Sequence, residues 1–256
     1  MDWSRREVLK AAAATAVTGG WLTARGTGSG VATASSDGRE PVANAVRQRV
    51  DASLPPGAVL FDLDDDGEYG ATVERAAEPV ADDAHPRPVR ITSDGRETVD
   101  YAASVLRPDG APALGDLDAL SYDYYAGPDD GGVPDETFLV VETDSGRHGM
   151  YLTYHDGDAG GEWRTHDVLA RATGDTGGTS GWFEYTSVEG DADGRTFDDA
   201  VERFGPDARI VRFGVGRGDG VDPVALDASY GAAVVGDRTY RFPAAVAQRR
   251  AGENPS

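Results

Sequence analysis

From residue 59 onward the chain consists of short apolar runs that are cut by Gly, Pro and Asp. Several runs alternate apolar and polar residues, and the breaks recur at the spacing that is typical of β-sandwiches and barrels. Strands are predicted at residues 58–61, 88–91, 98–106, 119–125, 137–143, 149–155, 162–167, 181–187, 209–215, 225–235 and 238–242.

Turn and cap signals join these runs. The segment DSGRH (144–148) and the pair Gly236-Asp237 each separate two predicted strands, which indicates two hairpins. One helix interrupts the strands, over residues 196–204. Its signals are Thr196 as N-cap, Asp199 three residues later, and the stop Gly205-Pro206.

Many short strands, one short helix and no βαβ alternation predict an all-β protein, a single β-sandwich of jelly-roll type. The sandwich is assigned to residues 59–243. Residues 35–58 are expected to form a polar tether with a short helix, and residues 244–256 a disordered tail.

The stretch ALSYDYYAG (119–127) places aromatic residues on both faces of one predicted strand. Leu120, Tyr122 and Tyr124 share a face, so we expect them in the core. Tyr125 and Asp123 lie on the opposite face and are candidate ligand-binding residues.

Residues 1–34 read as a cleavable export signal. Basic residues precede a mildly apolar run, and Ala32-Thr33-Ala34 offers a cleavage site. The run is too short and too rich in small residues for a stable membrane span. The segment Ser4–Lys10, with Arg5 and Arg6, resembles the twin-arginine signal, which implies recognition by the twin-arginine export machinery and export of the folded protein.

The net charge of the chain limits the kinds of partner that it can bind. The chain has 45 acidic and 24 basic residues, a net charge of −21, and the leader holds its only lysine. This pattern resembles the proteins of salt-loving archaea, whose carboxylates keep the surface hydrated. It argues against nucleic-acid binding, which needs a basic surface.

The absence of cysteine excludes disulfides, cysteine-ligated metals and a cysteine nucleophile. The export signal and the lack of a second apolar run long enough to span a membrane predict an extracellular or loosely cell-surface-associated protein.

Residues 119–243 contain, in order, the segments LSYDYYAG, TFLVVETDSGRHGMYLTYH, GDAGGEW, TFDDAVERFG, IVRFGVGRGDG and LDASYGAAVVGDRTYRF. This order of features resembles the secreted jelly-roll domains of bacterial and archaeal surface proteins. The closing strands are similar to those of many carbohydrate-binding modules, with Asp227 on the penultimate strand and Phe242 at the end of the last. The resemblance implies a sugar-binding or surface-attached sandwich and carries over no ligand-binding residue.

The segment FDLDDDGEYG contains the sharpest metal motif. Asp62, Asp64 and Asp66, followed by a glycine, match the first half of a calcium loop. An EF-hand needs a glutamate at the twelfth position, where this chain has Val73. A calcium site of another kind is one alternative, and a solvated acidic turn, which we favour in so acidic a chain, is the other.

The sequence contains no motif that clearly marks a catalytic site. The four histidines show no metal-ligand spacing and are expected at the surface or in loops, and no G-x-S-x-G segment occurs. A glycosidase needs only two carboxylates, and in a chain with 45 acidic residues a pair is no evidence.

Aromatic residues near Gly-rich loops are the remaining candidates for ligand binding, above all Trp163 and Trp182. We therefore expect a secreted, non-catalytic sandwich that binds a glycan or another cell-surface component in high salt. The alternatives are a glycan hydrolase or lyase with the same fold, and a structural or adhesive surface protein without a small ligand.

Overall fold

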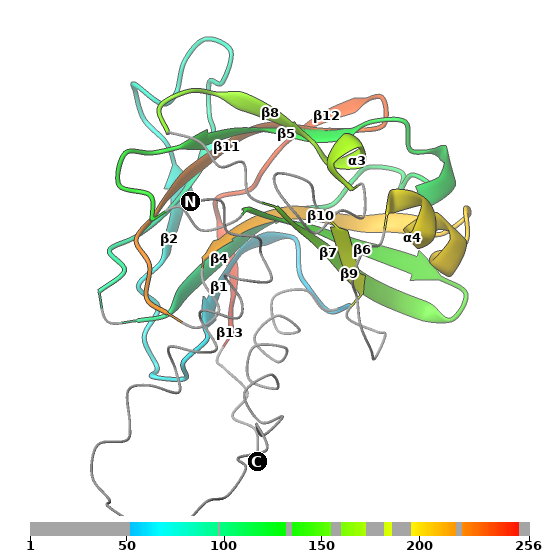
Figure 1. The fold of residues 1–256 in the computed structure, drawn as a ribbon, viewed down its shortest axis with the longest axis horizontal. Helices are drawn as coiled ribbons and strands as arrows, with labels where there is room; N and C mark the ends of the chain where they lie inside the picture. Colours follow the sequence, from blue (N-terminus) through cyan, green and yellow to red (C-terminus); the bar gives the residue numbers. More distant parts are fainter. Residues whose placement is uncertain are drawn as a thin grey trace, which may run out of the picture.

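The chain forms two β-sheets that lie face to face (Figure 1). The structure is a computed structural model, and it describes residues 52–96, 98–131, 135–154, 160–172, 182–185, 196–218 and 222–250. The predicted export signal, with Arg5 and Arg6, and the helix predicted in the tether lie outside these residues.

The described strands form a seven-stranded sheet and a six-stranded sheet. In spatial order the larger sheet contains β13 (Val246–Arg250), β1 (Gly57–Asp62), β4 (Asp100–Leu106), β10 (Arg209–Gly218), β6 (Asp135–Thr143), β7 (Gly146–Tyr154) and β9 (Trp182–Tyr185). The smaller sheet contains β2 (Thr72–Arg75), β3 (Val89–Ser93), β11 (Leu226–Val235), β5 (Leu120–Ala126) and β8 (Arg164–Asp167), and β12 (Arg238–Arg241) pairs with β11. β13 and β1 are parallel, whereas the other described pairs are antiparallel.

The all-β prediction is confirmed, and each predicted strand has a counterpart. Two strands were not predicted, β2 and β13, and both lie at sheet edges. β13 corrects the expectation of a disordered tail at 244–256, because residues 246–250 pair with β1. Its side chains are almost all exposed, so no apolar pattern marked it as a strand.

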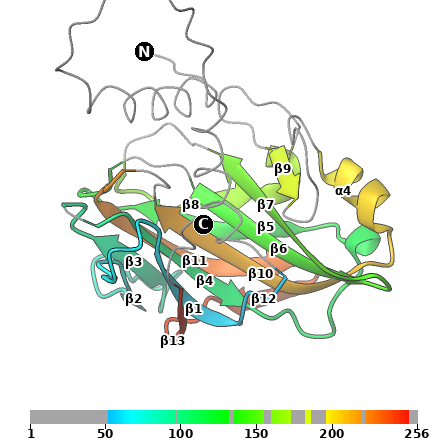
Figure 2. The ribbon, with the colours of Figure 1, turned by 90° about the horizontal axis from the view of Figure 1, so that it is seen from below.

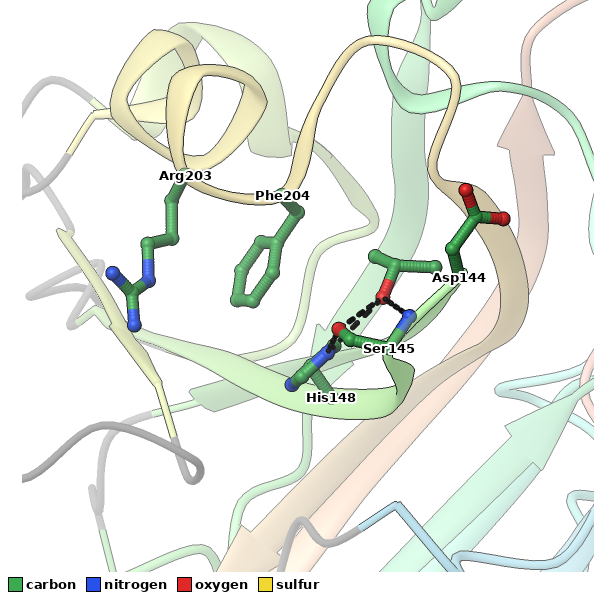
Figure 3. Close-up of a pocket in the computed structure, with 6 residues that line it drawn as sticks. Asp144, Ser145, His148, Arg203 and Phe204 are labelled. Carbon is green, nitrogen blue, oxygen red and sulfur yellow. Dashed lines mark hydrogen bonds between the residues drawn. The ribbon is translucent and has the colours of Figure 1, made fainter.

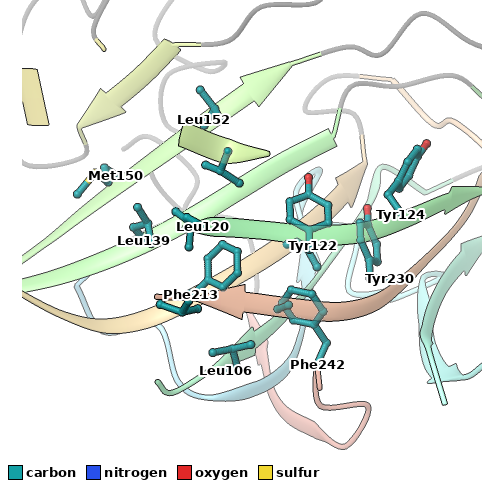
Figure 4. Close-up of a cluster of buried hydrophobic side chains, with 14 of the residues drawn as sticks. Leu106, Leu120, Tyr122, Tyr124, Leu139, Met150, Leu152, Phe213, Tyr230 and Phe242 are labelled. Atoms are coloured by element: carbon teal, nitrogen blue, oxygen red, sulfur yellow. The ribbon is translucent and has the colours of Figure 1, made fainter. Parts of the chain in front are cut away.

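The core fills the space between the sheets (Figure 4). Along β5 the side chains alternate between buried and half-buried, and Leu120, Tyr122 and Tyr124 face inward as predicted. The Tyr122 hydroxyl group accepts a hydrogen bond from Thr137 of the opposite sheet at 3.3 Å. The hydroxyl group of this core tyrosine is thus hydrogen-bonded across the sandwich, so the ring is buried without leaving a polar group unpaired.

The predicted helix is confirmed as α4 (Phe197–Phe204), which lies beside the larger sheet near β7 and β9 (Figure 2). Thr196 and Asp199 form a capping box, since each side chain accepts the other residue's backbone N–H. A second helix, α3 (Val168–Arg171), was not predicted, because four residues are too few to show a helical pattern.

A buried ion pair joins the two sheets at one end of the sandwich. Arg217 of β10 and Asp130, in the loop after β5, expose only 3% and 5% of their side chains. The guanidinium donates to the carboxylate from Nε at 3.1 Å and also from a terminal nitrogen. The same carboxylate accepts the backbone N–H of Asp227 in β11 at 3.1 Å. Asp130 therefore ties its loop to strands of both sheets.

Candidate functional site

Three of the predicted ligand-binding residues lie together on the outer face of the smaller sheet. Asp123 and Tyr125 point outward from β5, and Trp163 immediately precedes β8, the neighbouring strand. The Tyr125 and Trp163 ring centroids are 5.6 Å apart, with an angle of 50° between the planes. β8 also supplies Thr165, whose hydroxyl group donates to Asp123 at 2.8 Å. Pairing of two strands thus assembles the group.

A long loop between β2 and β3 adds a fourth residue, His85. Its ring stacks on Trp163 with 3.9 Å between centroids and 12° between planes. Its Nε2 atom lies 3.7 Å from the Asp123 carboxylate, and its Nδ1 atom lies 2.9 Å from Asp82. We call Asp123, Tyr125, Trp163 and His85 the outer-face cluster.

Asp82 fixes the position of the imidazole. Its carboxylate accepts the backbone N–H of His85 at 2.6 Å, and this bond is the main reason that the pKa of Asp82 lies below its usual value. Trp163 is held by the same loop, because its Nε1–H donates to the carbonyl oxygen of Val80 at 3.1 Å. Both rings are therefore positioned by directional bonds as well as by packing.

Gly231 of β11 lets the rings lie close against the sheet. A Cβ atom there would stand 3.0 Å from both Asp123 Cβ and His85 Cδ2, and 3.3 Å from Trp163 Cζ3. These distances are at the tight end of carbon contacts. A side chain at this position would push the stacked rings outward, so the glycine sets the depth of the outer-face cluster.

The outer-face cluster combines a ring surface with polar groups, which is the composition of a ligand-binding surface. Tyr125 and Trp163 are each partly exposed, and the Asp123 side chain exposes 25% of its surface. Aromatic rings can stack on the C–H face of a sugar, while a carboxylate and an imidazole can bind its hydroxyl groups. One face of Trp163 is covered by His85, so Tyr125 offers the freer ring.

The backbone of Trp182 belongs to β9, at the edge of the larger sheet, whereas the outer-face cluster stands on the smaller sheet. Its side chain is outside what the structure describes. The structure therefore brings three of the four predicted ligand-binding residues together, and the role of Trp182 stays a prediction.

The predicted calcium residues do come together. Asp62, Asp64 and Asp66 each place one carboxylate oxygen within 4.8 Å of the others, which is close enough to bind one hard cation such as Ca²⁺. Each carboxylate also accepts a backbone N–H. Asp62 binds those of Asp66 and Gly67 at 3.2 and 3.0 Å.

The other two carboxylates of this loop bind N–H groups on either side of it. Asp64 accepts from Val99 at 3.0 Å and Asp66 from Glu68 at 2.8 Å. Burial raises the pKa of Asp62 above its usual value, against the effect of its two N–H bonds. These bonds hold the acidic segment as a tight turn against Val99, which immediately precedes β4. A calcium site and a solvated acidic turn both remain predictions for it.

Sequence reasoning did not foresee the contacts of His85 or the burial of His166. His85 was expected at the surface or in a loop and does lie in a loop, but its contact with Trp163 joins segments 78 positions apart, which no local pattern reveals. His166 was assigned to the same class and is instead fully buried, with Nδ1 3.3 Å from the Tyr122 hydroxyl group. Its place on β8 opposite Tyr122 explains the burial.

Comparisons with known proteins assign neither a family nor a function to the chain. No model of a known protein family matches the chain, and no curated protein matches it. Among the described residues, none of the helices has the length and apolar character needed to cross a membrane.

Proposed function

We propose that this protein is a secreted, non-catalytic sandwich that binds a glycan or another cell-surface component in high salt. The observation that carries the proposal is the outer-face cluster. Asp123, Tyr125 and Trp163 were selected from the sequence as binding candidates, and they lie together on one face beside His85. A ring surface with convergent polar groups suits the two kinds of surface that a sugar presents.

The strand order supports a jelly-roll wiring for this sandwich. Four strands of the smaller sheet follow the order β3-β11-β5-β8, and four of the larger sheet follow β4-β10-β6-β7. Along the chain, β3 to β6 alternate between the sheets, and β10 and β11 return between the earlier strands. Eight strands in two sheets with such nested returns are the arrangement of two Greek keys.

Export and salt adaptation complete the proposal. The twin-arginine segment with Arg5 and Arg6 supports export of the folded chain, and the net charge of −21 supports work in concentrated salt. An exported protein of this kind would act outside the cell or at its surface, where glycans are abundant.

A glycan-array screen in molar KCl tests the proposal. We expect the wild-type protein to bind at least one class of glycan and Trp163→Ala to lose that binding, because Trp163 forms one wall of the outer-face cluster. Trp182→Ala is the matched control, since its strand belongs to the other sheet, and it should bind like wild type. Equal binding by Trp163→Ala would refute the assignment of the site.

The same screen separates binding from catalysis. Release of new reducing ends or unsaturated sugars from a bound glycan would instead support the hydrolase or lyase alternative. Absence of binding to every glycan would leave the structural or adhesive alternative.

A further inference from the structure

A ligand-sized hollow lies between the turn joining β6 to β7 and the last turn of α4 (Figure 3). Its volume is about 370 Å³, near the lower end for small-molecule sites. The residues that line it come from both segments: Thr143, Asp144, Ser145, His148, Arg203 and Phe204. The hollow borders the larger sheet and does not include the outer-face cluster.

Polar groups on the β6–β7 side are arranged around one imidazole nitrogen. His148 Nε2 lies 3.2 Å from the hydroxyl oxygen of Thr143 and 3.1 Å from that of Ser145. The two hydroxyl groups are 2.8 Å from each other. The Thr143 hydroxyl group also donates to the carbonyl oxygen of Gly146 and accepts the backbone N–H of Ser145, both at 3.2 Å. It is therefore engaged within the turn and holds Ser145 and His148 in position at the wall of the hollow.

The α4 side supplies a positive charge and a ring. Arg203 is exposed in the last helical turn, where a cation is favoured by the helix dipole. Among the described residues it makes no hydrogen bond or ion pair. Phe204 lies between Arg203 and His148 in Figure 3, and its ring centroid is 5.2 Å from that of His148.

The arrangement is suited to binding an anion. A guanidinium group binds carboxylate and sulfate through paired N–H donors, and hydroxyl groups can complete the contact. Asp144 is the one carboxylate among the lining residues, and in Figure 3 it is turned away from His148 and Arg203. It therefore neither orients the imidazole for nucleophilic chemistry, as a catalytic triad requires, nor neutralises the arginine.

We propose that this hollow binds a monosaccharide-sized ligand that carries a carboxylate or sulfate group. Arg203 binds the oxyanion, the hydroxyl group of Ser145 binds a ring hydroxyl group, and the Phe204 ring packs on the C–H face, while Thr143 holds Ser145 in place. The site is separate from the outer-face cluster, so either assignment can fail without the other.

Titration calorimetry of the full mature chain in molar KCl tests this site. The probes are glucuronate, glucose 6-sulfate and glucose. We expect saturable binding of at least one charged sugar and none of glucose, and preference between the two charged sugars identifies the oxyanion. Arg203→Gln should weaken binding at least about tenfold, which is the loss expected from a charge-assisted hydrogen bond.

Arg241→Gln is the matched control. Arg241 is an exposed arginine of β12 that likewise makes no hydrogen bond or ion pair among the described residues. This variant should bind like wild type, and equal unfolding midpoints of the two variants would show that both fold. No saturable binding of either charged sugar, equal binding of glucose, or unchanged affinity in Arg203→Gln would overturn the proposal.

Discussion

Removing the carboxylate of Asp130 should strongly destabilise the protein. Asp130 and Arg217 expose 5% and 3% of their side chains, so Asp130→Ala would remove a carboxylate that pairs with a buried guanidinium group. It would also remove the acceptor for the backbone N–H of Asp227. Breaking a buried ion pair in this way costs about 3–5 kcal/mol of the free energy of unfolding. For a protein of this size the melting temperature should fall by roughly 6–20 °C.

The control is an exposed ion pair between the same kinds of charged group. Glu142 and Arg147 are 2.7 Å apart and expose 47% and 45% of their side chains. Because water and salt screen such a pair, Glu142→Ala should cost at most about 1 kcal/mol. The difference between the two variants in the free energy of unfolding therefore reports how much burial adds to the effect of breaking an ion pair.

Denaturant unfolding in molar KCl and in low salt, followed by circular dichroism, measures both losses. The loss in Asp130→Ala should persist in high salt, since buried pairs are screened little. Replacing both partners by apolar residues, Asp130→Leu with Arg217→Met, should recover much of the stability, because neither charge of the pair is then buried. A loss below about 1 kcal/mol in Asp130→Ala, similar to that of Glu142→Ala, would refute the reasoning.

Three further predictions concern pH, export and salt. Burial raises the pKa of Asp100 above the usual aspartate value of 3.8, so the folded state is favoured by the protonated carboxyl group and loses that stability as the pH rises through the raised pKa. Asp100→Asn should therefore unfold at higher denaturant concentration than wild type near pH 7, with a gap that closes toward pH 3.8; a pH-independent gap would contradict this. Arg5-Arg6→Lys-Lys should retain the protein inside the cell in a fractionation assay, and continued export would exclude the twin-arginine route. Lowering the salt from molar to about 0.1 M lengthens the screening distance to about 10 Å and should lower the melting temperature, whereas an unchanged value would contradict adaptation to salt.

Local patterns in the sequence account for much of the fold. The alternation along residues 119–125 correctly separated inward Tyr122 from outward Tyr125, because a strand turns successive side chains to opposite faces. Thr196 and Asp199 correctly marked the start of α4, since a capping box is a contact between residues three apart.

Elements without a burial pattern were missed. β2 and β13 lie at sheet edges and expose most of their side chains, so nothing in their composition distinguished them from loops. Their backbone hydrogen bonds to a neighbouring strand define them instead, and such pairing has no signature within the segment itself.

The candidate site was predictable only in part. Asp123 and Tyr125 share one strand, so their common face followed from the sequence. The partners Trp163 and His85 reach them through strand pairing and a loop crossing, which depend on the whole fold. The separation of Trp182 from Trp163 depends on the assignment of their strands to different sheets and could not be foreseen.

The affinity of Tyr125→Ala for the best glycan of the array tests the central claim most directly. Tyr125 is partly exposed on an outer strand face, so its truncation should spare the fold, and Tyr69→Ala is a control at another partly exposed tyrosine. If the outer-face cluster is the binding site, calorimetry in molar KCl should show at least about a tenfold loss for Tyr125→Ala, near 1.4 kcal/mol, and no loss for Tyr69→Ala. Wild-type affinity in Tyr125→Ala, or equal losses in both variants, would contradict the account.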